Sequence, residues 1–134
     1  MNVYKYSEIT ERIIGCSLKV HTFLGNGFQE VVYQRSLEME FIQSKLDFAR
    51  EIEMEIFYRD FPQSVGTRRA DFIVKEKVLV ELKAVTSLNN IHMAQVLNYL
   101  KAYRLEVGLL LNFGEPSLKV KRLILSSNWN HRSS

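Results

Sequence analysis

The sequence has few of the features that direct a protein to a membrane or to an oxidising compartment. Its single cysteine, Cys16, excludes an internal disulfide and a cysteine-based zinc cluster, and favours a reducing setting. Residues 1–12 lack the apolar core of a signal peptide. The longest aliphatic run, Leu109 to Leu111 with Val107 nearby, is far too short to span a bilayer. We therefore expect a soluble, cytoplasmic protein with no membrane partner.

The chain also lacks a strong charge bias. A net charge of +3 over 134 residues permits a polyanionic partner without requiring one. With 46% hydrophobic and 25% charged residues, the composition is that of an ordinary globular protein, and the length suits one domain. The sequence shows neither repeats nor low-complexity stretches. We predict a single domain over residues 1–125, followed by a polar tail at 126–134.

Hydrophobic periodicity predicts an α/β fold. Apolar residues recur at helical spacing near residues 7–24, 28–44 and 91–103. Alternating or continuous apolar runs predict strands near residues 48–58, 68–74, 78–85, 106–113 and 118–125. This α-α-β-β-β-α-β-β order fits a mixed central sheet flanked by helices.

The most informative stretch is the hairpin predicted at residues 68–85, whose turn is Lys75-Glu76-Lys77. If Val74 pairs with Val78 across this three-residue loop, Asp71 stands opposite Glu81. One face of the hairpin is then apolar: Ala70, Phe72, Val74, Val78, Val80 and Leu82. The other face carries four charged residues, with Arg69 opposite Lys83 and Asp71 opposite Glu81. Ile73 and Leu79 lie on this face as well. Two carboxylates and an ammonium on one face make this end of the hairpin a candidate active site.

These residue types suit a divalent cation. Carboxylates are hard oxygen ligands for Mg²⁺ or Mn²⁺, and Leu82 can add its backbone carbonyl while its side chain stays in the core. Lys83 projects beside the metal, where an ammonium can favour a hydroxide and stabilise charge on a transferring phosphoryl group. A lone Glu-x-Lys is weak evidence, since amphipathic strands produce it often. Asp71 strengthens the case because two close carboxylates are costly unless a cation lies between them.

Two helices carry further polar candidates. Glu30 and Tyr33 are three residues apart and share a side of their helix, although an acidic residue there also answers the helix dipole. His92, Gln95 and Tyr99 form a polar stripe on the helix that follows the hairpin. His92 is equally suited to capping that helix.

Several of these motifs together resemble a known family. The stretch from Gly27 to Tyr33 matches the Gly-x-x-Glu-x-x-Tyr signature of the GxxExxY proteins, a branch of the PD-(D/E)xK nuclease superfamily. The resemblance runs from about Ile9 to Leu125 through four more motifs: Arg69-Ala70-Asp71-Phe72, Glu81-Leu82-Lys83, Gln95-Val96-Leu97-Asn98-Tyr99-Leu100 and Leu111-Asn112-Phe113-Gly114. It implies a restriction-endonuclease-like fold.

The resemblance also implies roles. Asp71, Glu81 and the Leu82 carbonyl would bind the metal, with Glu30 completing the site. The implied catalytic set is Asp71, Glu81, Lys83, Glu30 and Gln95, and Gly27 and Tyr33 are the structural residues of the motif. Ala70 stands where the superfamily's name has proline, and its side chain faces the core in the register above.

Two functions are compatible with these residues, one of an enzyme and one of a binding module. The first is a Mg²⁺-dependent nuclease, an enzyme that hydrolyses nucleic-acid phosphodiester bonds, preferably of DNA, and that works as a homodimer if both strands are cut. Its backbone contacts would come from Arg68, Arg69, His92, Tyr99 and Lys101. The alternative is a catalytically silent nucleic-acid- or protein-binding module on the same fold. Divalent-ion binding by the free protein discriminates the two.

Overall fold

A mixed sheet with helices on both faces makes up the part of the chain that the computed structural model describes, residues 4–125. Its elements are α1 (Ser7–Leu24), α2 (Glu30–Gln43), β1 (Phe48–Phe57), β2 (Ser64–Val74), β3 (Val78–Lys83), α3 (Asn90–Tyr103), β4 (Val107–Asn112) and β5 (Lys119–Ile124). The predicted order of helices and strands is confirmed. The predicted tail at 126–134 lies outside the described residues.

The five strands lie in the order β1-β2-β3-β4-β5. β3 and β4 run parallel, whereas the other neighbouring pairs are antiparallel. A parallel pair needs a crossover connection, and α3 provides it between β3 and β4. The α/β class with a mixed sheet is therefore confirmed.

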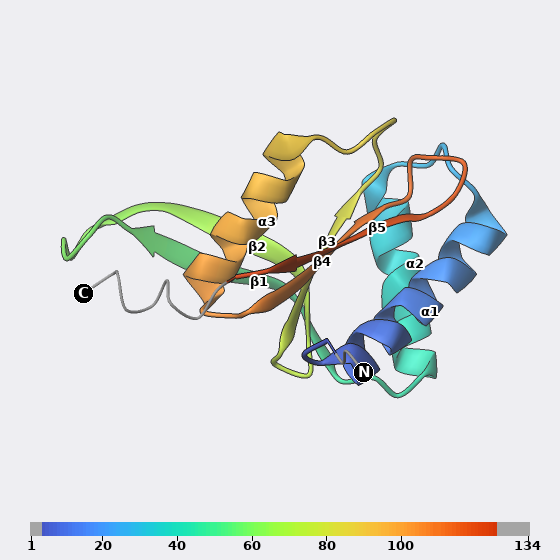
Figure 1. Ribbon diagram of the computed structural model, residues 1–134, viewed down its shortest axis with the longest axis horizontal. Coiled ribbons are helices and arrows are strands. Elements are labelled where there is room, and N and C mark those ends of the chain that lie inside the picture. Colours follow the sequence, from blue (N-terminus) through green and yellow to red (C-terminus); the bar gives the residue numbers. More distant parts are fainter. Residues whose placement is uncertain (1–3, 126–134) are drawn as a thin grey trace.

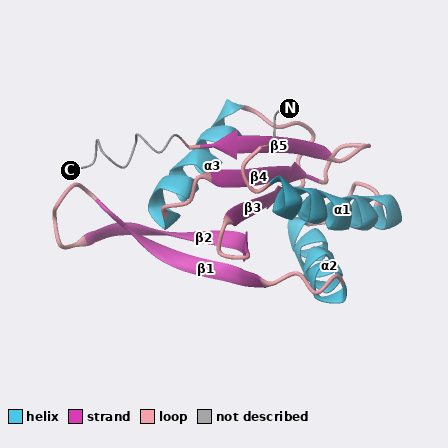
Figure 2. Cartoon of the chain, turned by 60° about the horizontal axis from the view of Figure 1, so that its bottom comes forward, coloured by secondary structure: helices cyan, strands magenta, loops and turns pink. Residues whose placement is uncertain are grey.

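Helices cover the two faces of the sheet unequally. α1 and α2 pack on one face, and α3 lies on the other (Figures 1 and 2). β4 is buried along its whole length because both of its faces are covered: Leu109 and Leu111 pack toward α1 and α2, and Leu110 packs toward α3. Within residues 4–125, none of the helices is both long enough and apolar enough to cross a membrane.

The hairpin of β2 and β3 has the predicted register only near its turn. Val74 pairs with Val78 and Phe72 with Val80, but the backbone pairing of these strands is not continued beyond Phe72. From there β2 stays with β1, as a ribbon that projects on the left of Figure 1, while β3 stays with β4. The strands thus separate at Asp71 and Glu81.

This separation corrects two expectations. Arg69 pairs with Glu53 of β1 and not with Lys83, because β2 has already left β3 at that point. Ala70 is buried as expected, but it packs in the cluster under α3 rather than with Phe72 on the opposite face. The change of face occurs where β2 loses its neighbour on one side and is free to twist.

Candidate active site

The carboxylates of Asp71 and Glu81 each accept a backbone hydrogen bond from the opposite strand at the point where β2 and β3 separate. The backbone N–H of Asp71 donates to Glu81 Oε1 over 2.9 Å, and the backbone N–H of Leu82 donates to Asp71 Oδ2 over 2.8 Å. Backbone donors near the end of a ladder need other acceptors, and here the two carboxylates supply them. Each side chain is thereby fixed to the opposite strand, with the two carboxylates side by side.

Burial and mutual repulsion disfavour the charged form of both carboxylates. Burial raises the pKa of Glu81 to about 9, with further raising by Asp71. Burial likewise raises the pKa of Asp71 to about 6, opposed by the Leu82 N–H and by the positive charge of Lys83. At neutral pH such a pair of carboxyl groups holds one proton, or a bound cation takes the place of that proton.

The backbone of Leu82 adds a third oxygen to this place. The N–H and C=O of one strand residue project to the same side, and the sides alternate along the strand. The carbonyl of Lys83 accepts from the Phe113 N–H beside β4, over 2.8 Å. The N–H and C=O of Leu82 therefore project the other way, toward Asp71, while its side chain is fully buried. Two carboxylates and a carbonyl are the donor set that suits Mg²⁺ or Mn²⁺.

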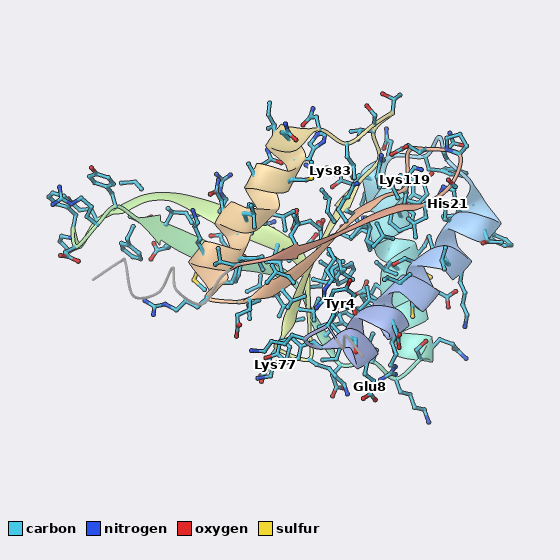
Figure 3. All side chains as sticks on the ribbon, viewed as in Figure 1. Tyr4, Glu8, His21, Lys77, Lys83 and Lys119 are labelled. Carbon is cyan, nitrogen blue, oxygen red and sulfur yellow. The ribbon has the colours of Figure 1, made fainter. Side chains whose placement is uncertain are left out.

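Lys83 is the final residue of β3 and is half-buried beside the carboxylates. Its positive charge lowers the pKa of Asp71, Glu81 and Glu30 against the effect of burial, so the ammonium lies near all three groups. Figure 3 shows Lys83 between α3 and the pair formed by α1 and α2. An ammonium in this position can stabilise negative charge that develops next to the carboxylates.

The Gly-x-x-Glu-x-x-Tyr stretch forms the entry to α2. The Tyr33 hydroxyl donates to the Gly25 carbonyl over 2.6 Å and accepts from the Phe28 N–H over 3.2 Å. The Tyr33 ring stacks on Phe113, with centroids 4.8 Å apart. Gly27 has a φ of 109°, which L residues with side chains rarely adopt. Gly27 and Tyr33 thus fix the loop that leads into the first turn of α2.

Glu30 is the residue that this loop delivers. It begins α2 and is more than one-third exposed, yet partial burial of its carboxyl raises its pKa, with Lys83 lowering it in opposition. Within residues 4–125, no three His, Cys, Asp or Glu side chains come close enough together to hold a metal ion. The carboxylate pair is therefore Asp71 and Glu81, with Glu30 nearby, and the ligand role of Glu30 stays a prediction.

Gln34 is a site residue that the sequence analysis missed. It is buried, and its Nε2 donates to Asp71 Oδ1 over 3.2 Å. Gln34 stands one helical turn after Glu30, and this spacing was the signal that could have revealed it. Asp71 is thus held by a side chain from α2 and by the backbone of β3.

The polar residues of α3 fall into two groups. The Arg68 guanidinium lies over the Tyr99 ring, with the guanidinium carbon 5.5 Å from the ring centroid. Burial raises the pKa of Tyr99, and the negative charge of Glu81 raises it further, so this pair lies near the carboxylates. Gln95 is half-buried one turn before Tyr99. His92, in contrast, caps α3: its Nδ1 accepts from the Asn89 N–H over 3.2 Å.

The two other cations predicted to contact a substrate lie elsewhere on the surface. Arg69 forms an exposed ion pair with Glu53, 3.1 Å long, on the β1–β2 ribbon. Lys101 lies in the last turn of α3 and is half-buried. Contacts of these residues with a substrate stay predictions.

Comparison with known families decides the membership of the chain. The family model described as the PD-(D/E)XK nuclease superfamily matches residues 7–123. The chain belongs to this superfamily. The matched range includes Asp71, Glu81 and Lys83, and their assignment to the acidic and lysine positions of the superfamily motif stays a prediction.

A solved structure has a fold similar to that of this chain. The crystal structure of SSO0001 has a TM-score of 0.58 and 21% sequence identity, and the match covers 78% of this chain and 55% of that chain. The chain thus spans about half the length of that protein. An alkaline exonuclease, LHK-Exo from Laribacter hongkongensis, matches with a TM-score of 0.43 and 10% identity over 98% of this chain and 76% of that one. No curated protein matches. The restriction-endonuclease-like fold of the superfamily is confirmed.

Proposed function

We propose that this protein is a Mg²⁺- or Mn²⁺-dependent nuclease of the GxxExxY branch, which hydrolyses phosphodiester bonds of DNA. The observation that carries the proposal is the Asp71–Glu81 pair: a buried and a half-buried carboxylate held side by side, with an ammonium next to them. A side chain buried at such a cost is expected where function requires it. Membership of the nuclease superfamily supports the same reading.

In this proposal Asp71, Glu81 and the Leu82 carbonyl hold the cation, and Glu30 contributes to its environment. A bound Mg²⁺ supplies a Lewis acid that polarises the phosphate and lowers the pKa of water. Lys83 stabilises the negative charge that develops on the phosphoryl oxygens as the water oxygen bonds to phosphorus and the bond to the leaving oxygen breaks. Gln95 positions Lys83 or a neighbouring phosphate.

The substrate side of the proposal rests on the positively charged side chains of β2 and α3. Arg68, stacked on Tyr99 near the carboxylates, is placed to contact a phosphate next to the reacting one. Arg69, His92 and Lys101 would contact the backbone further away. We further propose that the protein acts in the cytoplasm, where its buried Cys16 stays reduced, and as a homodimer, because cutting both strands of a duplex needs two sites.

Two variants separate the proposed roles. We expect Asp71→Ala to abolish Mn²⁺ binding in calorimetry and cleavage of labelled single- and double-stranded DNA. Lys83→Ala should bind Mn²⁺ but cleave at least about 100-fold more slowly, since its role is electrostatic. Lys121→Ala, at an exposed position of β5, is the control and should behave as wild type.

Metal binding by wild type decides between the nuclease and the binding module. Undiminished cleavage by Asp71→Ala or Lys83→Ala would refute the assigned roles. Absence of Mn²⁺ binding in wild type would favour the silent binding module. The moderate net charge of +3 argues against tight autonomous DNA binding by such a module.

A further inference from the structure

The hydroxyl of Tyr103 bonds to the backbone of both β1 and β2. Ile52 and Ala70 are paired residues in these strands. The Ala70 N–H donates to the Tyr103 hydroxyl over 3.1 Å, and that hydroxyl in turn donates to the Ile52 carbonyl. The Arg68 carbonyl, 3.3 Å away, is a second acceptor within its reach. A side chain from α3 therefore bonds to both strands at this pair.

This contact lies next to the active site. Ala70 immediately precedes Asp71, whose own N–H is committed to Glu81 on the other side. On β1, Glu51 has a φ of 53°, and the regular pairing passes from Arg50–Phe72 to Ile52–Ala70 around it. At Asp71, then, β2 is irregular toward both of its neighbours, and the Tyr103 hydroxyl bonds to the residue that precedes it.

Packing holds the Tyr103 side chain in place beside Ala70. It is only 9% exposed and belongs to the cluster that α3 forms with the sheet, together with Val96 and Leu100. Ala70 belongs to the same cluster, whereas Phe72, two residues on, packs on the opposite face. The position of Ala70, and through it the course of β2 into Asp71, is therefore tied to α3.

We propose that Tyr103 is a positioning residue for the metal site, whose hydroxyl ties Ala70 and Ile52 to α3 and so sets Asp71 beside Glu81. This inference rests on the proposed metal-dependent function. Removal of the hydroxyl leaves the pairing of Ile52 with Ala70 between β1 and β2, so the fold is kept. Ala70 is then no longer tied to α3, and Asp71 next to it is held less firmly beside Glu81.

The test is a calorimetric titration of Mn²⁺ into wild type, Tyr103→Phe and Ser64→Ala. Ser64 is a matched control, because its hydroxyl also bonds the backbone of both β1 and β2, at Ile56 and Gly66, at the far end of the ribbon. We expect Tyr103→Phe to bind Mn²⁺ about tenfold more weakly at little loss of thermal stability. Ser64→Ala should retain wild-type affinity. Equal affinity in wild type and Tyr103→Phe would overturn the inference and leave the proposed function intact.

A second measurement uses a protein that keeps the hydroxyl. With 3-fluorotyrosine at position 103, saturation with Mg²⁺ should shift the fluorine resonance, because metal binding at Asp71 moves Ala70 against the hydroxyl. The same label at Tyr58, in the ribbon's exposed loop, should not respond. A resonance at position 103 that stays unchanged at saturation would also overturn the inference. Failure of wild type to bind either ion would overturn the proposed function, and this inference with it.

Discussion

The Asp71 and Glu81 carboxylates each accept a hydrogen bond from the backbone of the opposite strand, over 2.8 and 2.9 Å. These bonds compensate only part of the cost of burial, since the pKa values of both groups remain raised. A residue that destabilises its own metal-free fold is expected where a ligand later supplies the missing charge. At the scale of single residues, the candidate site is therefore marked by two close carboxylates whose burial costs free energy when no cation is bound.

Replacement of Glu81 by Gln should therefore stabilise the metal-free protein at alkaline pH. Between the ordinary pKa of a glutamate and about 9, folded wild type binds a proton that the unfolded chain releases, so its stability falls as pH rises through this range. Glu81→Gln lacks this dependence. We expect it to gain on the order of 1 to 3 kcal/mol over wild type at pH 8 and much less at pH 5.

Urea unfolding in EDTA at the two pH values measures the difference, with Glu55→Gln, an exposed residue of β1, as control. A Glu81→Gln variant whose stability falls with pH as steeply as wild type would contradict the cause assigned here. Added Mg²⁺ should narrow the gap, because it favours the ionised glutamate of wild type.

At the scale of the element, the entry to α2 is formed by the Gly27–Tyr33 motif. Tyr33 satisfies backbone groups on both sides of the turn, and Gly27 adopts the backbone conformation that closes it. The same helix then presents Glu30 and, one turn later, Gln34 to the site. A short loop therefore controls two polar side chains at once.

Substitution of Gly27 by Ala should act through backbone strain alone. A Cβ at Gly27 would meet no atom within 4 Å, but φ is 109° there. We expect a loss of about 1 to 2 kcal/mol. Gly66→Ala is the matched control, because its added Cβ also meets nothing and its φ is not positive. Thermal denaturation of both variants measures the contrast, and equal stabilities would argue against strain at Gly27.

At the scale of the whole molecule, the site lies where the ends of β3 and β4 are fastened together. The buried Asn112 accepts from the Val85 and Gly114 N–H groups and donates to the Val85 carbonyl and the Glu115 carboxylate. The chain leaving β4 therefore lies directly against the chain leaving β3, just after Lys83. Gly114 permits this approach.

Gly114→Ala should destabilise the protein more than Gly27→Ala. Its Cβ would lie 2.3 Å from the Val85 carbonyl oxygen and 2.4 Å from the Val85 nitrogen, so the backbone itself must move. We expect a loss of about 2 to 4 kcal/mol, together with weaker catalysis through displacement of Lys83. Gly15→Ala, in α1 with open space around it, should instead gain about 0.5 to 1 kcal/mol. Chemical denaturation compares the two, and a wild-type midpoint for Gly114→Ala would refute the clash.

The sequence by itself determined the elements and the centre of the site. Alternation and helical spacing act locally, so they predicted the order of helices and strands, and the turn after Val74 predicted that Asp71 and Glu81 lie close together. Lys83 came with them because it is on the same strand. Gly27 and Tyr33 were identified through a motif rather than through the contacts that explain them.

Only the tertiary structure decided how the site is held. Gln34 reaches Asp71 from α2, 37 residues away, and Tyr103 reaches Ala70 from α3, 33 residues away. The spacing from Glu30 to Gln34 places both on one side of α2, but it does not name Asp71 as the partner of Gln34. Both contacts depend on how a helix packs against the sheet. The separation of β2 from β3 was equally hidden, since a hairpin pattern reads as continuous until competing neighbours, here β1 and β4, divide its strands. Patterns along the sequence thus indicate which side chains are chemically suited to the site. The packing of elements that are far apart in the chain decides where those side chains lie.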